Sequence, residues 1–545
     1  MNKKRISTLI VALLVMSTAV AGCGKKDVKS DTNSDASIMT PYGKYPTVVP
    51  YTIGKAISTN SRLPAGDTYE NNLYTKYVND KLNVKSSNAW EANSPEAQTQ
   101  KISLAIASGN IPDVMLVDRK TLKQLVDNNL IADLTDAYKK CLSPFLTEQY
   151  GTYGDKLVKE GTFDGKLMGI SGTNIDQSHT MLWLRKDWLD KLGLQPPKTI
   201  DDLQNIAQQF IQKDPGGNGA GKTVGLVANP DLGGVYTSMN CLDTIFSNFG
   251  AYPKQWMADS SGKAFYGSIA PEMKPALTKL NEMYSKGILD KEFGIRSGDD
   301  TNALLINGKC GMTIGQWWEP WPLSDGIKVN PKANWVAYAA PLDSNGKVNV
   351  YSQDPVNLFM VVKKGFAHPE LAVKVLNVEY DALRMQDPTT KDIYKGLGTD
   401  WAAIPIGLQI DYNDQISRIT KALNNSIAKK SSEGLREDIK TYYEDVVKNS
   451  SNPGSNPGSW AVATARVMGG NVASDPAYVM HDPVFFGVTP TMETKWANLQ
   501  KLEKESFLKM VMGQSPISDF DKFVQTWKQA GGDDITKEVN KLMKK

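Results

Sequence analysis

Short apolar runs alternate with longer amphipathic stretches along most of the chain, and this alternation limits the folds that it can adopt. The runs predict buried strands, and the stretches, whose apolar residues recur every three or four positions, predict helices. Predicted strands are Val48–Ile53, Asp113–Val117, Thr180–Leu184 and Leu358–Val362. Predicted helices are Tyr69–Leu82, Pro95–Ser108, Thr199–Gln212, Pro271–Lys286, Pro369–Tyr380 and Thr491–Met512. This order is typical of an α/β fold, and 545 residues exceed what one core usually organises, so two or more lobes are expected.

Residues 1–22 have the composition of a signal peptide, because a basic start precedes an apolar stretch from Ile6 to Val20 that is too short to span a bilayer. The stretch ends in Val20-Ala21-Gly22-Cys23, which resembles the bacterial lipobox. We therefore expect Cys23 to be lipidated and residues 23–44 to form a flexible tether at the extracellular face of the cell membrane. An ordinary secretory signal with a chance cysteine is the alternative.

Charge and cysteine content exclude several classes of function. The net charge of +3 equals the charge of Lys3, Lys4 and Arg5, so the chain without its signal peptide is formally neutral. A nucleic-acid partner is therefore not expected, since such proteins carry a basic surface. The cysteines other than Cys23 are widely spaced and odd in number, which favours buried free thiols over disulfides or a zinc site: Cys141, Cys241 and Cys310.

Several segments, taken in order, resemble the extracellular solute-binding proteins of ABC importers, and in particular the large oligosaccharide-binding lipoproteins of Gram-positive bacteria. The most specific is LWLRKDWLDKLGLQPPKTIDDL, at Leu182–Leu203. The others are Gln100–Asp118, Ile131–Tyr138, Phe163–Ser171, Ile306–Trp318, His368–Asn377 and Phe520–Gly532. The resemblance implies a Gram-positive source and a two-lobed periplasmic-binding-protein-like fold (class II), in which the lobes close on a ligand held between them.

The same resemblance implies where the chain crosses between the lobes, near Ser171–Ser178 and near Asp343–Ser352. The first lobe is then expected to comprise residues 45–172 and 343–400. The second lobe is expected to comprise residues 173–342, with mainly helices of the same lobe over 401–545.

A sugar presents hydroxyl groups to amide, carboxylate and guanidinium partners, and flat C–H faces to aromatic rings. The block Gly315–Trp321 offers both kinds of partner in Trp317, Trp318 and Glu319. By spacing, Trp317 matches an aromatic residue that commonly floors the sugar site in this family. The segment Lys448–Ser459, which repeats Asn-Pro-Gly, predicts a loop directly before Trp460. The resemblance implies that this loop presents Trp460 to the cleft. For each of these indoles, a place in the core is the alternative.

Other ligand-binding residues are expected from their position along the chain. Residues just beyond strand ends face the crevice of an α/β fold, which favours Asn60, Arg62, Asp118 and Arg119 in the first lobe. Gln177 lies on the first crossing. Trp183 and Arg185 share one face of a strand, which faces either the cleft or a helix-covered core.

The segment Gly216–Thr223 matches the phosphate-binding pattern GxxxxGK[ST], but a helix precedes it and the strand-like Thr223–Ala228 follows, the reverse of what phosphate binding needs. It resembles instead the calcium loop of many solute-binding proteins. Asp214 and Asn218 remain, whereas Gly216 and Lys222 replace carboxylates. Because calcium needs several hard oxygen ligands, we expect the loop to keep its shape without tight metal binding.

These features predict a monomeric receptor that captures an oligosaccharide and delivers it to ABC permease subunits, with no cofactor and no catalytic residue. A surface-anchored polysaccharide-degrading enzyme is the main alternative, since paired carboxylates for glycoside cleavage are not excluded by composition. A carbohydrate sensor or adhesin with the same fold is another.

Overall fold

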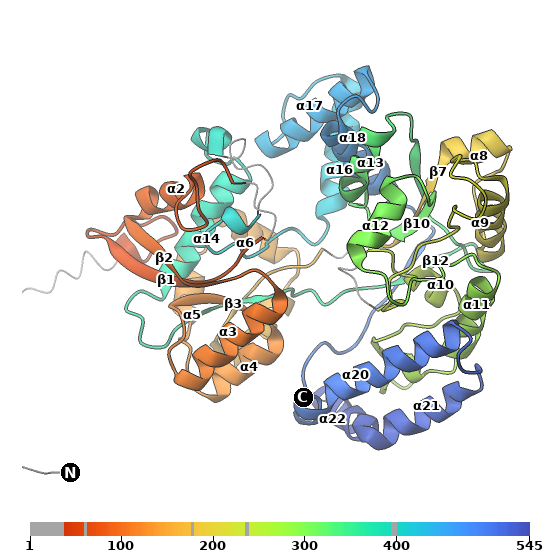
Figure 1. Cartoon of the computed structure of the whole chain (residues 1–545). Coiled ribbons are helices and arrows are strands. Elements are labelled where there is room, and N and C mark those ends of the chain that lie inside the picture. The colour runs from red at the N-terminus through yellow and green to blue at the C-terminus, as the bar shows by residue number, and fades with distance from the viewer. Residues whose placement is uncertain (1–36, 59–62, 176–178, 235–238, 394–400, 545) are drawn as a thin grey trace, which may run out of the picture.

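The computed structural model describes residues 37–58, 63–175, 179–234, 239–393 and 401–544. The chain forms two α/β lobes, each organised around its own sheet (Figure 1). Within the described ranges, no helix combines the length and apolar composition that a membrane span requires. The predicted α/β class is confirmed.

The first lobe is built on a five-stranded sheet in the order β2-β1-β3-β13-β6. Strand β1 is parallel to β2 and β3, so these three strands end at the same edge, whereas β13 runs antiparallel to its neighbours. The strands are β1 (Val49–Ala56), β2 (Val84–Ala92), β3 (Val114–Val117), β6 (Ile170–Ser171) and β13 (Phe359–Val362). The helices are α2 (Leu73–Leu82), α3 (Pro95–Ser108), α4 (Arg119–Asp127), α5 (Thr135–Cys141), α6 (Pro144–Gly151), α7 (Lys156–Glu160) and α14 (Glu370–Leu383), and β4 (Thr162–Phe163) pairs with β5 (Lys166–Leu167).

Local signals in the sequence set several helix ends. Ser94 caps α3 by accepting a hydrogen bond from the Ala97 amide, Pro95 occupies the first turn, and Gly109 ends the helix in the left-handed region at φ 66°. These signals account for the agreement between the predicted and observed bounds of α3. Helix α9 (Ile200–Lys213) begins in the same way, at a capping box between Thr199 and Asp202.

The second lobe is built on a three-stranded antiparallel sheet in the order β10-β7-β11. Its strands are β7 (Met181–Arg185), β10 (Met312–Gly315) and β11 (Trp335–Tyr338), and a hairpin joins β8 (Trp256–Ala258) to β9 (Ala264–Tyr266). Besides α9, its helices are α8 (Lys186–Leu192), α10 (Asp243–Asn248), α11 (Met273–Ser285), α12 (Gly298–Ile306) and α13 (Pro320–Val329). The predicted strand Thr223–Ala228 is wrong, because this segment makes only two isolated bridges, Val224 to Cys310 and Leu226 to Leu289.

Strand β7 is buried on both faces. Leu182 and Leu184 pack into the main core of the second lobe, while Met181 and Trp183 pack into a separate cluster that includes Trp317, Trp335 and Trp460. Alternation along the strand therefore directs Trp183 away from the leucines, as the sequence predicts. The face that carries Trp183 is a helix-covered core.

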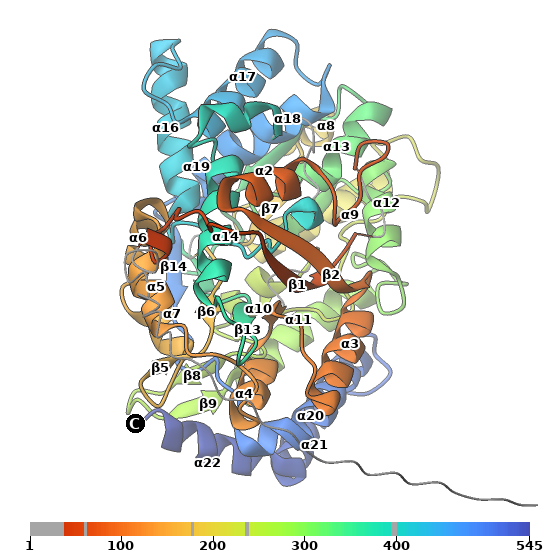
Figure 2. The same cartoon turned by 90° about the vertical axis from the view of Figure 1, so that its left-hand side faces the viewer.

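Helices from the last quarter of the chain cover the two ends of the molecule (Figure 2). One group is α16 (Gln415–Lys429), α17 (Glu437–Ser451), α18 (Pro457–Ala463), the π-helix η4 (Thr464–Gly469) and α19 (Gly470–Ala473). The other is α20 (Pro490–Val511), α21 (Asp519–Trp527) and α22 (Asp533–Leu542), whose apolar residues complete the main core of the second lobe. The predicted loop Lys448–Ser459 is mostly wrong, since α17 continues to Ser451 and α18 begins at Pro457.

Three chain segments that connect the lobes run side by side. The Thr173 amide donates to the Gln409 carbonyl (2.8 Å), and the Asn174 amide donates to the Pro355 carbonyl (2.9 Å). The second crossing therefore lies at Gln353–Val356 rather than near 343–352, because β12 (Val348–Tyr351) pairs with β14 (Tyr478–His481) instead. Near Gln409 the chain crosses a third time, and the core of the first lobe accordingly extends to Ile410.

The burial of Trp183 allows a test of this packing. Trp183→Ala removes a fully buried ring and its hydrogen bond to the Gln316 carbonyl, so the free energy of unfolding should fall by about 3–5 kcal/mol. Leu104→Ala, on an exposed face of α3, serves as the control and should change the value by less than about 0.5 kcal/mol. Denaturant unfolding followed by circular dichroism measures both. Equal midpoints for the two variants would contradict the placement of Trp183.

Candidate functional site

A short turn in the second lobe carries several groups suited to a polar ligand. We call residues Gln316–Trp321, which follow β10 and lead into α13, the site loop. The Trp183 indole donates to the Gln316 carbonyl (2.9 Å) and so holds the start of the loop on β7. Trp317 is buried, Trp318 is half-buried, and the rings of Trp317 and Trp321 meet edge to face at 5.5 Å.

Several polar atoms of the site loop are buried without a hydrogen-bond partner among the described residues. These atoms are Oε1 of Gln316, Nε1 of Trp317 and both carboxyl oxygens of Glu319. Each buried polar group left unpaired costs about 1–3 kcal/mol, so folded proteins contain few of them. A ligand that supplies donors and acceptors would offset this cost.

Glu319 differs from the other buried carboxylates of the second lobe. Burial alone raises the pKa of Glu319 to about 8. Glu503 is equally buried, but it accepts hydrogen bonds from Tyr266 (2.9 Å) and Ser268 (2.8 Å), which tie α20 to the neighbouring hairpin. The Glu319 carboxyl is therefore protonated at neutral pH and has no equivalent structural task.

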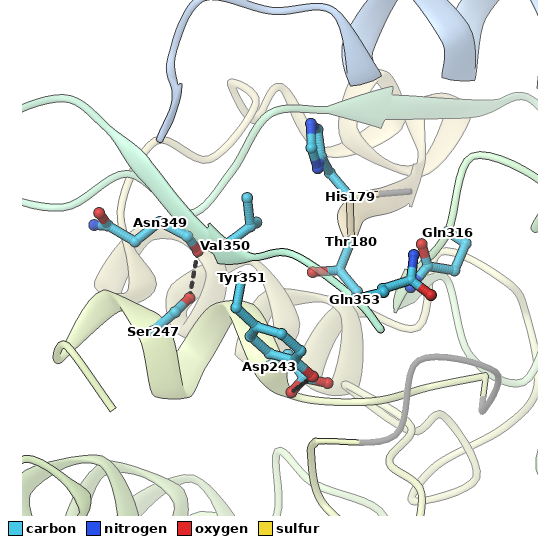
Figure 3. A pocket seen from close by; sticks show the side chains of 9 residues that line it. All are labelled: His179, Thr180, Asp243, Ser247, Gln316, Asn349, Val350, Tyr351 and Gln353. Carbon is cyan, nitrogen blue, oxygen red and sulfur yellow. Dashed lines mark hydrogen bonds between the residues drawn. The ribbon is translucent and has the colours of Figure 1, made fainter. Parts of the chain in front are cut away.

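A small polar cavity, which we call the hinge cavity, lies between the site loop and the crossing segments (Figure 3). Its volume of about 20 Å³ suits water rather than a sugar ring. It is lined by His179, Thr180, Asp243, Ser247, Gln316, Asn349, Val350, Tyr351 and Gln353. Gln316 and Gln353 both line the cavity, and Oε1 of each is buried and unpaired within the described part of the chain.

Burial controls the charges around this cavity. It lowers the pKa of His179 to about 4, so the imidazole is neutral at physiological pH and stacks against Tyr478 at 4.7 Å. It also raises the pKa of Asp243, whose Oδ1 accepts hydrogen bonds from the Tyr351 hydroxyl (2.9 Å) and the Gly234 amide (2.6 Å). The neutral imidazole therefore adds no positive charge to the polar wall of the cavity.

The first lobe contributes a larger recess of about 410 Å³ between α3 and α4, at the carboxyl end of β3. Its polar lining includes Gln98, Ser103, Asp118, Thr121 and Gln124, and its apolar lining includes Ile102, Leu116 and Leu358. Asp118 caps α4 by accepting a hydrogen bond from the Thr121 amide (2.7 Å). The recess occupies the sheet edge where ligands usually bind in α/β folds.

Arg119 connects this recess to the crossing segments. Its guanidinium forms two hydrogen bonds to Asp354, from Nε (2.7 Å) and from Nη2 (2.6 Å), and it also pairs with Glu160. Because these carboxylates engage its donors, Arg119 anchors the second crossing to α4 and is not available to a ligand in this conformation.

Trp183, Arg185 and Trp460, all expected to contact ligand, are buried. Trp183 and Trp460 belong to the same apolar cluster, and Arg185 pairs with Asp187 while lying over the Trp188 ring at 5.0 Å. We assign these three side chains a supporting role, because Trp183 and Trp460 pack in the apolar cluster and Asp187 engages the Arg185 guanidinium.

Other predicted residues lie outside the described ranges. Asn60, Arg62, Gln177 and Cys23 belong to this group. Trp317, Trp318 and Glu319 come together in the site loop, whereas Asp118 lies in the first lobe.

The sequence did not single out Gln316, Gln353, His179 or Asp243. Gln316 could have been included because it precedes Trp317 in the aromatic block. The other three could not be identified from the sequence, because long-range contacts bring them together. These contacts are the pairing of β12 with β14 and the hydrogen bond from Gln353 to the Ile175 carbonyl.

The loop that resembles a calcium site is closed by hydrogen bonds. Asp214 accepts from the amides of Asn218 (3.0 Å) and Gly219 (2.7 Å) and from the Thr223 hydroxyl (2.7 Å). The Asn218 side-chain amide donates to Thr223 and to the Gly308 carbonyl. Protein donors thus contact the carboxylate at the place where the resemblance implies a cation.

A model of the bacterial extracellular solute-binding protein family matches residues 80–377, which is more than half of the chain. The chain belongs to this family. This solute-binding protein is similar to the polygalacturonan/rhamnogalacturonan-binding protein YtcQ of Bacillus subtilis (strain 168), at 22% identity over 470 residues that cover 83% of this chain and 84% of YtcQ. It is also similar to lipoprotein LipO of the same organism, at 21% identity over 551 residues that cover 99% of each chain.

Among solved structures, the solute-binding protein shares its two-lobed fold with the alginate-binding protein AlgQ2, crystallised without calcium ion. The TM-score is 0.64 at 16% identity, and the match covers 92% of this chain and 99% of AlgQ2. At this identity the likeness concerns the fold and not the ligand.

The unpaired Glu319 carboxyl predicts how the stability of the solute-binding protein depends on pH. The pKa of Glu319 is raised from 4.5 to about 8 on folding, so stability is lost as pH rises through this range. Glu319→Gln removes the dependence, and its free energy of unfolding, relative to the parent, should improve between pH 5 and pH 8 by on the order of 4 kcal/mol.

Urea unfolding at both pH values provides the measurement. Glu503→Gln is the matched control, because it puts an amide where two hydroxyl donors need an acceptor, and it should destabilise the protein at both pH values. A Glu319→Gln variant with the same pH profile as the parent would contradict the assignment.

Proposed function

We propose that this protein is the membrane-anchored substrate-binding lipoprotein of an ABC importer, which captures an oligosaccharide between its lobes and delivers it to the permease. Membership of the solute-binding family supports capture of a solute. The names of YtcQ and AlgQ2, which are binding proteins for polygalacturonan or rhamnogalacturonan and for alginate, support a carbohydrate ligand.

The observation that carries the proposal is the chemistry of the site loop. Within four residues it combines two indole rings with unpaired buried atoms of Gln316, Trp317 and Glu319. An oligosaccharide has flat C–H faces for the rings and hydroxyl groups that both donate and accept hydrogen bonds, so it matches each of these needs. An apolar ligand would leave the polar atoms unpaired.

In this proposal the ligand bridges the lobes. Trp317, Trp318 and Glu319 contact it from the second lobe, and Asp118 and the recess contact it from the first. Asn60, Arg62 and Gln177 remain proposed contacts outside the described ranges. The three crossing segments act as the hinge about which the lobes close, and the protein works as a monomer.

Anchoring completes the proposed mechanism. Residues 1–22 direct export, Cys23 receives the lipid, and residues 23–44 tether the lobes to the extracellular face of a Gram-positive cell membrane. The name of LipO, which matches over 99% of each chain, supports a lipoprotein. A tethered receptor stays at high effective concentration near its permease.

An enzyme that degrades polysaccharides is less well supported, because the similar proteins are named for binding. Its distinguishing sign is turnover of a bound oligosaccharide. A sensor or adhesin would bind sugar without supporting uptake, and growth of a deletion strain on the identified oligosaccharide separates it from an importer component.

Binding can be tested with the full-length chain in detergent by titration calorimetry against neutral and acidic plant and microbial oligosaccharides. At least one should bind, and product analysis should show no cleavage. Trp318→Ala, which removes a half-exposed ring, should lower the affinity for the sugar about tenfold, or about 1.4 kcal/mol, because stacking on the ring is lost. Trp401→Ala, which removes an exposed ring from the first lobe, is the control and should bind like the parent. Absence of binding to every oligosaccharide would overturn the proposal.

The anchor has its own test in the native host. Cys23→Ser should abolish incorporation of labelled palmitate and move the protein from the membrane fraction to the medium, because the lipidated thiol is lost. Cys241→Ser, which alters a buried thiol, should leave labelling and location unchanged. Labelling of the Cys23→Ser protein would contradict this part of the proposal.

A further inference from the structure

Among the described arginines, Arg466 is distinguished by having no carboxylate partner within the described residues. The chain has nine arginines, and all but Arg5 and Arg62 lie in the described ranges. Six of the described arginines form an ion pair within 4.0 Å: Arg119, Arg185, Arg296, Arg384, Arg418 and Arg436. Among described residues, Arg466 has no such partner.

Aromatic rings surround the Arg466 guanidinium instead. Its Cζ atom lies 4.5 Å from the ring centre of Trp317, 4.8 Å from that of Tyr442 and 5.5 Å from that of Trp321. Cation–π contacts of this kind use ring faces and stabilise the charge, but they leave the N–H groups unpaired. Nε and Nη1 are indeed buried with no hydrogen-bond partner in the described ranges.

The backbone around Arg466 holds the side chain against the site loop. Arg466 belongs to the π-helix η4, and such irregular helices are frequent at functional sites. Thr420 of α16 donates to the Arg466 carbonyl (2.9 Å). Gly469 packs so tightly on the site loop that a Cβ atom there would lie 2.7 Å from the Trp317 carbonyl oxygen. The backbone that carries Arg466 is therefore packed closely on the site loop.

The unpaired donors define the chemistry of what binds there. A guanidinium binds a carboxylate through two parallel hydrogen bonds, and the adjoining rings of Trp317 and Trp321 suit the C–H face of a sugar. A neutral sugar would leave a desolvated charge without a counterion, which is unfavourable. We propose that Arg466 binds the carboxylate of an acidic sugar, so that the ligand of this protein is a uronate-containing oligosaccharide. The inference rests on the proposed function, because it requires an oligosaccharide at the site loop.

The test compares charged and neutral forms of the same sugars. The full-length chain is titrated calorimetrically with oligogalacturonates, alginate oligosaccharides and glucuronate-substituted xylo-oligosaccharides, each as the acid and as its methyl ester. At least one acid should bind, and its ester should bind at least tenfold more weakly, because the ester has no charge to pair with Arg466. The affinity for the acid should also fall as salt is added.

Variants then locate the effect. Arg466→Gln should lower the affinity for the acid at least tenfold while changing the affinity for the ester less than twofold. Arg466→Lys should retain part of the preference for the acid, because it keeps the charge but loses the planar guanidinium. Arg418→Gln, whose parent side chain pairs with Asp414 at an exposed position, is the control and should bind like the parent.

Each result decides a different point. Equal affinity for acids and esters, or tight binding of neutral sugars alone, overturns the inference and leaves the proposed function intact. An Arg466→Gln variant that weakens acid and ester equally also overturns it, because Arg466 would then only support the loop. No binding to any sugar overturns the proposed function itself. If Arg466→Gln does not fold, the comparison of acid with ester on the unaltered chain, together with Arg466→Lys, still decides the matter.

Discussion

The hydrogen bonds among the three crossing segments determine how the two lobes are positioned. Thr173 is central, because its amide donates to Gln409 and its hydroxyl accepts from the Asp411 amide (2.8 Å), which joins the first crossing to the third. Asn174 joins the first crossing to the second through the carbonyls of Asp354 and Pro355. Side-chain pairs then attach the bundle to the first lobe, with Arg119 on Asp354 and Arg384 on Asp411. A change in the angle between the lobes must therefore be absorbed in a few residues whose polar groups are already paired with one another.

This arrangement contrasts with the site loop a short distance away. At the crossings, the backbone amides of Thr173 and Asn174 are paired across segments, whereas on the loop Gln316, Trp317 and Glu319 keep buried atoms that have no partner among the described residues. The contrast between Glu503 and Glu319 makes the same point within one lobe, since one buried carboxyl holds two hydroxyl groups and the other holds none. Unpaired buried groups reduce stability, and natural proteins tolerate such defects mainly where function needs them. A polar ligand would therefore offset a cost that the loop carries in the described structure.

The sequence predicted the fold well where local signals and burial agree. The bounds of α3 follow from Ser94, Pro95 and Gly109, and the alternation along β7 correctly separates Trp183 from its leucine neighbours. The sequence predicted the strands less well where pairing between distant segments of the chain determines the structure. Residues 348–351 look like part of a crossing until Tyr478–His481 pairs with them, and Thr223–Ala228 looks like a strand although its neighbours in space allow only isolated bridges. Nothing local in the sequence reveals either outcome.

The same limit applies to the site. The aromatic block at Trp317 is visible in the sequence because its composition is unusual, but a charged residue becomes informative only once its partners are known. The residue type does not distinguish Arg119 from Arg466, and Arg119 occupies the more promising position, directly after a strand. In the structure Arg119 is engaged by Asp354 and Glu160, while Arg466 lies against aromatic rings and pairs with no carboxylate of the described residues. Charge pairing is a property of the folded chain, so the one described arginine without a carboxylate partner could be found only by accounting for the carboxylates that engage the other six.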